Sequence, residues 1–271
     1  SAIDYIVGWD FYRRGNNGRV ADFYSTADNE AAQLILTNES GSITGWLDKS
    51  TEAANGYESM KGAAVNWQKI GDKYYYQTKI NASEFTNIKV QAQMLYNYIA
   101  HKTQKIEYSV DGTNWTEAGR ATMPAAKTVT DIEATLGEDA NNASELYIRF
   151  IPDYTSDRDG SGDGDASNDG TSITNIFVTG TMKLVDDGKA PALVSTVPAT
   201  GAANASANGR VVMTFDEKIK LTAAAKASLN GEELALSASG KAVTAEYKNL
   251  SYATEYTFQL AAGSVSDLTD N

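Results

Sequence analysis

Cysteine is absent from this sequence of 271 residues, and histidine occurs once, as His101. A chain without cysteine forms no disulfide bonds, and one histidine cannot build the cysteine and histidine clusters that hold structural zinc. The lone histidine also leaves a single candidate base for a catalytic set of serine, histidine and aspartate. Carboxylate pairs occur, but no recognisable motif surrounds them. These shortages argue against the common zinc-dependent and nucleophilic active sites.

Long apolar runs and an excess of positive charge are also missing. No segment approaches the roughly 18 uninterrupted apolar residues that a membrane helix needs, so we expect no membrane insertion. Lys and Arg number 23 against 35 Asp and Glu, which gives a net charge of −12. This balance argues against a nucleic-acid partner and against binding to an anionic membrane surface. It weakens, without excluding, a polyanionic substrate such as pectin.

The composition changes along the chain, and the change predicts two domains. Residues 1–187 hold 27 acidic and 16 basic residues, whereas residues 188–271 hold 8 and 7. All four Trp lie in the first part, and Ala and Ser dominate the second. The turn-forming residues 186–191 are the natural linker, so we expect domains at 1–187 and 188–271.

The clearest strand pattern lies in residues 87–96, where apolar and polar residues alternate. A period of two with one apolar side is typical of a half-buried antiparallel strand. Residues 105–110 repeat the pattern and run into a turn at residues 111–114, where Asp caps and Gly accepts positive φ. Between the two strands, residues 96–103 are too irregular to continue either one. We therefore expect a strand, an exposed aromatic and basic loop, a second strand and a tight turn.

Further short segments rich in β-formers follow the same logic, and no periodic helix of convincing length occurs in the first part. These segments are residues 3–12, 31–37, 57–67, 74–80, 129–136, 146–151 and 173–184. Many short strands with Gly and Asn turns predict an all-β chain: a jelly-roll β-sandwich followed by a smaller sandwich.

Residues 108–115, with the sequence YSVDGTNW, resemble a hairpin that is common in bacterial extracellular jelly-roll modules. Together with residues 74–77, 85–90, 146–153 and 169–178 they resemble the noncatalytic, galactose-binding-like module of secreted polysaccharide-degrading enzymes, pectate lyases among them. The resemblance spans residues 3–185. It implies a β-sandwich and suggests carbohydrate binding, without fixing the ligand.

The second part resembles a bacterial Ig-like domain. Residues 198–201 form a P-x-x-G turn, residues 210–219 match a segment ending in Phe-Asp-Glu-x-Ile, and residues 265–271 match V-x-D-L-x-x-N. The resemblance implies an Ig-like β-sandwich. Six alternating segments are present where seven strands are the usual minimum, so we expect residues 188–271 to lack the last strand. We also expect another domain after Asn271 in the natural protein.

Two loops and a third region supply the side chains that carbohydrate binding needs. Aromatic faces stack on sugar rings, polar groups orient hydroxyls, and Arg or Lys can bind a sugar carboxylate. The candidate residues are Arg13, Arg14, Arg19, Trp46, Tyr57, Lys61, Tyr96, Tyr98, His101 and Lys102. The alternative remains open that the arginines are solvated and the aromatics belong to the core, where we place Tyr108 and Trp115.

An acidic loop at residues 157–169 is the candidate calcium site. Hard carboxylate oxygens separated by flexible Gly suit Ca²⁺, although the spacing departs from an EF-hand. The candidate ligands are Asp157, Asp159, Asp163, Asp165 and Asp169. An ordinary solvated loop has the same composition, so a structural calcium ion and a plain loop both remain possible.

The leading hypothesis is a noncatalytic carbohydrate-binding module with an Ig-like spacer. The pair would target a secreted or cell-surface polysaccharide-degrading enzyme to plant cell-wall polysaccharide such as pectin, with the catalytic domain downstream. One alternative is that both domains are structural spacers or adhesion domains of a cell-surface protein. Another is an enzyme acting by itself, because sandwich folds also host catalysis.

Overall fold

The structure is a computed structural model of the chain. It describes residues 4–12, 20–44, 47–54, 57–66, 68–161 and 170–271, and for residues 47–62 it describes the backbone alone. Within these residues it contains β-strands and three short 3-10 helices at Ala27–Asn29, Ile70–Asp72 and Glu138–Ala140, and it contains no α-helix. The all-β prediction is therefore confirmed. None of the described helices is long and apolar enough to cross a membrane.

Two compact units make up the chain. The first comprises Ser1–Phe23 and Asp28–Thr181, and the second comprises Tyr24–Ala27 and Met182–Asn271. We describe each unit by itself.

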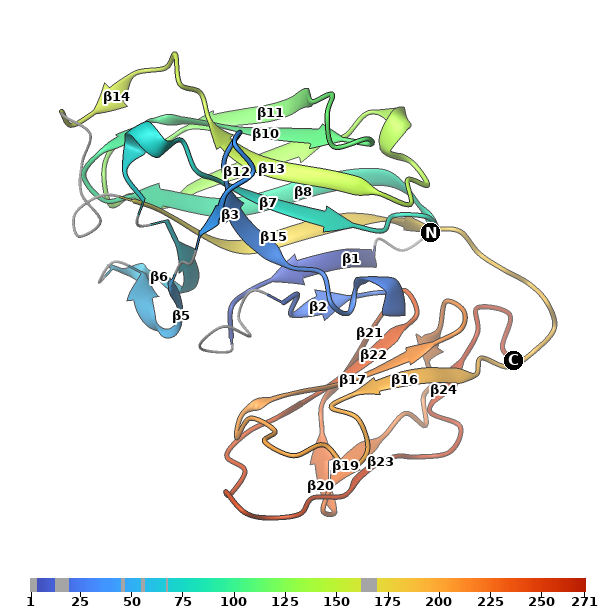
Figure 1. The fold of residues 1–271 in the computed structure, drawn as a ribbon. Helices are drawn as coiled ribbons and strands as arrows, with labels where there is room; N and C mark the ends of the chain where they lie inside the picture. The colour runs from blue at the N-terminus through green and yellow to red at the C-terminus, as the bar shows by residue number, and fades with distance from the viewer. Residues whose placement is uncertain (1–3, 13–19, 45–46, 55–56, 67, 162–169) are drawn as a thin grey trace. The chain divides into compact units, whose positions relative to one another are not determined.

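A seven-stranded sheet forms one layer of the first unit (Figure 1). Its central strands lie in the order β12, β8, β15, β1 and β2, and β6 pairs with both β15 and β5. The strands are β1 (Asp4–Trp9), β2 (Phe23–Tyr24), β5 (Leu47–Ala54), β6 (Tyr57–Val65), β8 (Phe85–Tyr96), β12 (Thr130–Thr135) and β15 (Thr171–Met182).

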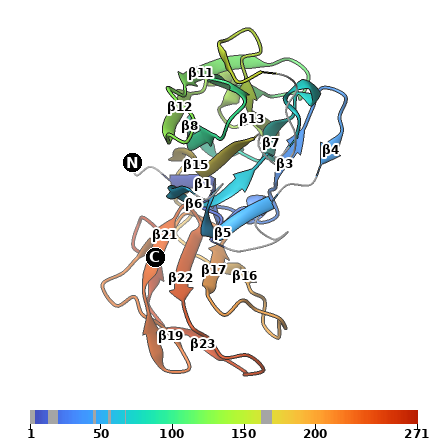
Figure 2. The same cartoon turned by 90° about the vertical axis from the view of Figure 1, so that its left-hand side faces the viewer.

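A six-stranded sheet forms the other layer, in the order β11, β10, β13, β7, β3 and β4 (Figures 1 and 2). The strands are β3 (Leu34–Thr37), β4 (Ile43–Thr44), β7 (Tyr75–Ile80), β10 (Thr103–Ser109), β11 (Thr116–Thr122) and β13 (Leu146–Pro152). A separate pair, β9 (Ala100–His101) and β14 (Arg158–Asp159), runs antiparallel beside them.

The core of the first unit follows from the alternation of its strands. In β8, Ile88 and Val90 are 1% exposed, whereas the intervening Lys89 and Gln91 face solvent, as the period of two predicts. Along one edge the two sheets come very close. A Cβ placed on Gly119 of β11 would meet the backbone oxygen of Glu133 in β12, and would lie 2.9 Å from the Cβ of Ala134. Glycine at this position therefore permits the close approach of the two layers.

The second unit contains nine strands, several of them very short. A four-stranded sheet runs in the order β16, β17, β22 and β21, and Figure 2 shows these strands side by side. Its strands are β16 (Leu193–Val197), β17 (Gly209–Phe215), β22 (Ala242–Tyr247) and β21 (Leu236–Ser239). The remaining strands are β18 (Lys220–Leu221), β19 (Ala227–Leu229), β20 (Glu232–Leu234), β23 (Phe258–Leu260) and β24 (Val265–Ser266).

The core of the second unit lies on one face of its four-stranded sheet. Met213, Phe215 and Val243 are buried there and pack against half-buried side chains from the shorter strands, such as Leu260. The six segments expected from the sequence lie at or near β16, β17, β20, β22, β23 and β24, and the count missed β18, β19 and β21. These three strands have two to four residues, too few for a clear alternation.

Candidate functional site

Several residues proposed for carbohydrate binding lie where the structure gives no side-chain description. Arg13, Arg14, Arg19 and Trp46 fall outside the described residues. Tyr57 and Lys61 lie in β6, for which only the backbone is described. Their roles stay predictions.

Tyr96 does not lie in an exposed loop. It is the last residue of β8 and is fully buried, and its hydroxyl donates a hydrogen bond of 2.7 Å to Oδ2 of Asp159. Burial raises the pKa of Tyr96 to about 12, and the hydrogen bond to the Asp159 carboxylate adds to the shift. An enclosed ring offers no face to a sugar, so Tyr96 orders the adjacent loop and does not stack on a ligand.

Tyr98 is the exposed aromatic of the predicted loop. Its side chain is 49% exposed, and Nζ of Lys127 lies 4.6 Å from the centre of its ring. His101 lies three residues on in β9, where its ring meets Tyr154 edge-on with 5.6 Å between the ring centres. The neighbouring Lys102 is half-buried. Tyr98 and Lys127 together offer a small aromatic and cationic surface of the kind the sequence suggested.

The antiparallel pair of β9 and β14 joins the two predicted loops. His101 pairs with Arg158, and Ala100 pairs with Asp159. The backbone N–H of Lys102 also donates to the carbonyl of Asp157. The aromatic loop therefore lies beside the start of the acidic loop, a proximity that the sequence did not predict.

Two of the five candidate calcium ligands can be placed. Asp157 and Asp159 are exposed, whereas Asp163, Asp165 and Asp169 fall outside the described residues. The hydroxyl of Tyr96 lowers the pKa of Asp159, against the opposing effect of partial burial. Because only two of its five candidate ligands are described, the calcium site at residues 157–169 stays a prediction.

A shallow depression of about 350 Å³ opens on the outward face of the seven-stranded sheet. It is lined by Gln91, Ala92, Gln93, Asp131, Ile132, Glu133, Asn175 and Phe177. Pairing of β12 with β8 sets Asp131 opposite Gln93 and Glu133 opposite Gln91. Strand pairing thus gathers amides and carboxylates from three strands onto one surface.

The polar groups of this depression form a chain across the three strands. Nδ2 of Asn175 donates to Oε1 of Gln93 at 2.8 Å, and Nε2 of Gln93 donates to Oδ1 of Asp131 at 3.2 Å. Amides and carboxylates held in this way keep further lone pairs and N–H groups for a ligand. These hydrogen-bonded side chains therefore present fixed donors and acceptors at the sheet surface.

Phe177 lines the depression, and its ring lies beside two further aromatic rings. The Phe177 ring lies 5.2 Å from that of Tyr5 and 5.8 Å from that of Phe23, measured between ring centres. Tyr5 is 45% exposed. A Cβ on Gly8 would come within 2.8 Å of the Phe177 ring, so the absence of a side chain at Gly8 leaves room for this ring. We call Tyr5, Phe23 and Phe177 the aromatic trio.

The outward face of the six-stranded sheet carries a second group of aromatics, which is engaged by charged residues. The guanidinium of Arg149 lies 3.9 Å from the Trp115 ring centre and 5.0 Å from that of Tyr75. Trp115 was expected in the core, yet it is half-buried on this face. Tyr108, the other residue expected there, is 4% exposed and donates its hydroxyl to Asp139.

The sequence offered a partial signal for the depression. Gln91 and Gln93 were recognised as the polar side of a strand, but not as ligand-binding residues. Their partners Asp131 and Asn175 lie 38 and 82 residues from Gln93. The period of two reveals which side chains share a face of one strand, whereas the identity of the neighbouring strand is set by tertiary pairing.

Two segments of the second unit suggested its family. Residues 210–219 lie in β17 and the turn after it, and residues 265–271 run from the start of β24 onward. Residues 187–271 match the family model of the bacterial Ig-like domain. We call this part the Ig-like domain. No curated protein matches the chain in sequence.

Three solved structures match part of the chain at low sequence identity. The CBM22-1-GH10 modules of endo-1,4-β-D-xylanase 10B from Clostridium thermocellum, complexed with xylohexaose, match at 9% identity and a TM-score of 0.35, over 69% of this chain and 30% of that one. The cleaved adhesin domain K2 of Lys-gingipain matches at 12% identity and 0.35, over 67% and 99%.

A mutant of the family 29 carbohydrate-binding module CBM29-2 matches at 14% identity and a TM-score of 0.28, over 58% of this chain and 98% of that one. Likeness this remote assigns neither a ligand nor a function to the chain.

Proposed function

We propose that the first unit binds carbohydrate without catalysis and that the Ig-like domain acts as its spacer. The observation that carries the proposal is the depression on the seven-stranded sheet, where a chain of amide and carboxylate groups adjoins the aromatic trio. A sugar ring has apolar C–H faces and a rim of hydroxyls, and a site for it combines aromatic surface with a few oriented polar groups.

The roles within this site follow from the chemistry of the side chains. Tyr5 and Phe177 offer ring faces to the C–H surface of a sugar. Gln93 and Asn175 each provide donor and acceptor atoms that match hydroxyl groups. Asp131 and Glu133 accept hydrogen bonds from hydroxyls, and their negative charge disfavours a sugar carboxylate. The depression therefore suits a neutral polysaccharide.

An acidic polysaccharide such as pectin fits a different surface. Lys127 lies beside Tyr98 and could hold a sugar carboxylate next to this aromatic ring, and Lys102 belongs to the same predicted loop as Tyr98. Targeting to pectin in plant cell walls is thus the narrower proposal and belongs to the loop at residues 96–102. The broader proposal of carbohydrate binding does not depend on it.

The physiological role we propose is targeting. A binding module tethered to a polysaccharide-degrading enzyme raises the effective concentration of the catalytic domain on its polymer. In this role the chain is secreted or exposed on the cell surface, and the Ig-like domain sets the distance between module and enzyme.

Affinity electrophoresis of the full chain tests the proposal. Gels contain neutral polysaccharides or pectins, and retardation reports binding. We expect retardation by at least one neutral polysaccharide, and we expect Tyr5→Ala and Gln93→Ala each to weaken it about tenfold, since a lost stacking or hydrogen-bonding contact costs about 1–1.5 kcal/mol.

Two controls separate the surfaces. Gln77→Ala lies on β7 of the other sheet and should leave retardation unchanged. Tyr98→Ala should matter only for pectin. If Tyr98→Ala weakens the retardation and Tyr5→Ala does not, the binding site lies in the loop at residues 96–102 and not in the depression. A chain that no polysaccharide retards would contradict carbohydrate binding and favour two structural spacers.

A further inference from the structure

Three carboxylates of the Ig-like domain converge from distant points of its sequence. Asp187 precedes β16, Glu217 lies in the turn after β17, and Asp267 directly follows β24. One carboxylate oxygen from each residue lies within 4.8 Å of the others. Glu217 is 7% exposed and Asp267 is 1% exposed, whereas Asp187 lies at the surface. We call these three residues the carboxylate cluster.

Strand pairing brings the cluster together. β18 pairs with β24, with Lys220 opposite Ser266, so the turn before β18 lies next to the residue after β24. The segment before β16 is held to the same turn by Asp216. Its backbone N–H donates to the Ala192 carbonyl at 3.0 Å, and its Oδ1 accepts from the Ala192 N–H at 2.8 Å. The convergence is therefore built into the fold of the domain.

Glu217 is the residue that points to a ligand. Its Oε2 is buried and accepts no hydrogen bond from any residue that the structure describes. A buried carboxylate oxygen without a partner is costly, and two further carboxylates nearby increase the cost. Burial raises the pKa of Glu217, and the charges of Asp187 and Asp267 raise it further. A cation held between these carboxylates would offset both costs.

Asp267 is held rigidly as a carboxylate. Its Oδ1 accepts hydrogen bonds from the backbone N–H groups of Thr269 and Asn271, both at 2.8 Å, and its Oδ2 accepts one from the Asn271 amide at 3.1 Å. Burial opposes ionisation, but these hydrogen bonds outweigh it and lower the pKa of Asp267. Each oxygen has two lone pairs, so Oδ2 retains capacity for a cation.

We propose that the carboxylate cluster is a calcium-binding site. Ca²⁺ takes six to eight oxygen ligands at about 2.3–2.6 Å, so oxygens around one ion lie up to about 5 Å apart, a spacing that the cluster meets. Mg²⁺ requires shorter bonds in a strict octahedron, and Zn²⁺ prefers nitrogen and sulfur. Three carboxylates provide the charge, and water or backbone carbonyls complete the shell. This site is separate from the loop at residues 157–169.

Calcium titration of the full chain, after treatment with EDTA, tests the proposal. We expect calorimetry to detect binding and the Tm of one unfolding transition to rise by roughly 5–15 °C in excess Ca²⁺. Asp187→Asn keeps the fold because Asp187 is exposed, and it should weaken this binding about tenfold or more. Glu217→Gln should abolish the rise in Tm caused by calcium.

Matched variants make the result specific. Glu232→Gln removes the same charge from an exposed position in β20 and should bind Ca²⁺ like the parent chain. The double variant Asp163→Asn and Asp165→Asn should lose any calcium bound by the acidic loop and keep the rise in Tm. The proposal is wrong if Ca²⁺ leaves every transition unchanged, or if the rise survives both Asp187→Asn and Glu217→Gln. A larger response to Mg²⁺ than to Ca²⁺ would also overturn the assignment of the ion.

Discussion

Individual carboxylates in this protein titrate differently because their surroundings differ. The N–H groups of Asn114 and Thr113 hold the pKa of Asp111 well below its ordinary value, in the turn between β10 and β11. Glu217 has the opposite shift, because burial and neighbouring negative charge disfavour its ionised form. Asp111 therefore favours folding as an ionised group, whereas Glu217 does so only as a neutral group.

The raised pKa of Glu217 predicts a pH-dependent difference between the parent chain and Glu217→Gln in EDTA. A carboxyl with a raised folded-state pKa favours the folded state below its ordinary value of 4.5 and loses this contribution as the pH rises through the folded-state pKa. Glu217→Gln should therefore have the higher Tm near pH 7, and the two curves should converge in acid. Thermal unfolding from pH 4 to 7 measures this, with Glu232→Gln as the control. A constant difference across this range would mean that Glu217 is not perturbed.

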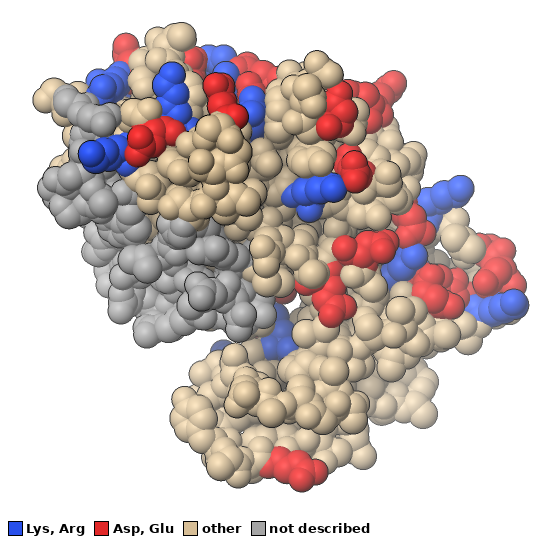
Figure 3. All heavy atoms as spheres, in the orientation of Figure 1, with Lys and Arg blue, Asp and Glu red and all other residues tan. Residues whose placement is uncertain are grey.

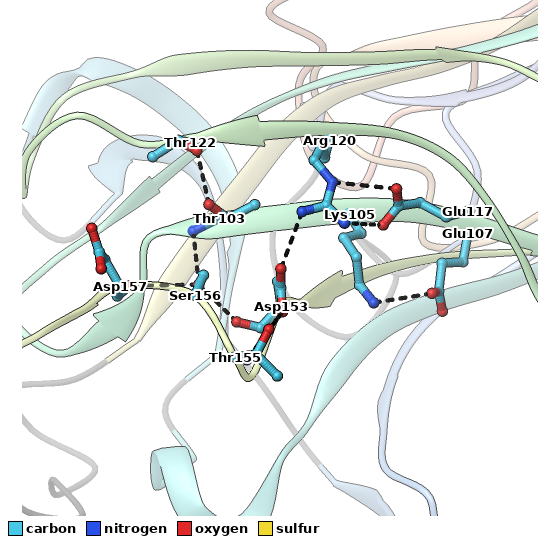
Figure 4. A network of polar contacts seen from close by, with 10 residues as sticks. All are labelled: Thr103, Lys105, Glu107, Glu117, Arg120, Thr122, Asp153, Thr155, Ser156 and Asp157. Atoms are coloured by element: carbon cyan, nitrogen blue, oxygen red, sulfur yellow. Dashed lines mark hydrogen bonds and ion pairs between the residues drawn. The ribbon is translucent and has the colours of Figure 1, made fainter.

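Ion pairs hold charged side chains in place on the outward face of the six-stranded sheet. Glu107 in β10 accepts from Arg149 in β13 with Oε1, at 2.6 Å from Nη2, and meets Nζ of Lys105 at 3.2 Å with Oε2. Figure 4 shows the ion pair of Glu107 with Lys105. It also shows a second group of ion pairs, in which Arg120 contacts both Glu117 and Asp153. Arg149 is thus fixed by a carboxylate and two aromatic rings together.

Glu107→Gln should lower the free energy of unfolding by about 1–3 kcal/mol, because Arg149 would remain mostly buried without its counter-charge. Side chains of both residues are less than 15% exposed, at 12% and 14%. Glu117→Gln is the matched control: its side chain is 38% exposed, and the change should be within about 1 kcal/mol. Urea denaturation measures both. Equal effects of the two variants would contradict the role of burial.

Strands could be predicted from the sequence where one face of the strand is buried and the other is exposed to solvent. β8 was predicted at residues 87–96 from the alternation around Val90; it spans Phe85–Tyr96, so its end agrees with the prediction and its start lies two residues earlier. Trp115 was misplaced because a residue just outside a strand has no alternation to assign its face. Local patterns thus fix the strands better than their ends.

Candidate sites could be predicted from the sequence only where their residues are close together along the chain. The acidic run from Asp157 to Asp169 drew attention because its carboxylates are adjacent, and it yielded a calcium prediction. The carboxylate cluster spans 80 residues between Asp187 and Asp267, and none of its members lies in an acidic run as dense. Antiparallel pairing of β18 with β24 creates that proximity, and the sequence carries no direct signal of which strands pair.

For the whole molecule, the net charge of −12 shapes which polymers can bind. On the face drawn in Figure 3, Lys and Arg side chains stand among Asp and Glu and do not form one basic patch. Long-range attraction of a polyanion is therefore weak, and contacts with a neutral polysaccharide depend on stacking and hydrogen bonds.

Retardation by a neutral polysaccharide should accordingly change less than about twofold when NaCl is raised to about 0.5 M, because screening acts on charges and not on stacking. Retardation by pectin, if observed, should fall over the same range, since Lys127 and Lys102 would contact carboxylates. Affinity electrophoresis at the two salt concentrations compares the polymers. A steep salt dependence for the neutral polymer would argue against the depression as its site.

The carboxylate cluster also has a mechanical consequence. Asp187 precedes the first strand of the Ig-like domain, and Asp267 follows β24, the last strand in the structure. An ion bound at the proposed site would join the segment before β16 to the segment after β24. Tension applied across these two points would load the ion–oxygen bonds before the backbone ladders of β16 and β24. With calcium bound, the Ig-like domain should therefore resist stretching until the ion–oxygen bonds break, and without calcium it should yield at lower force.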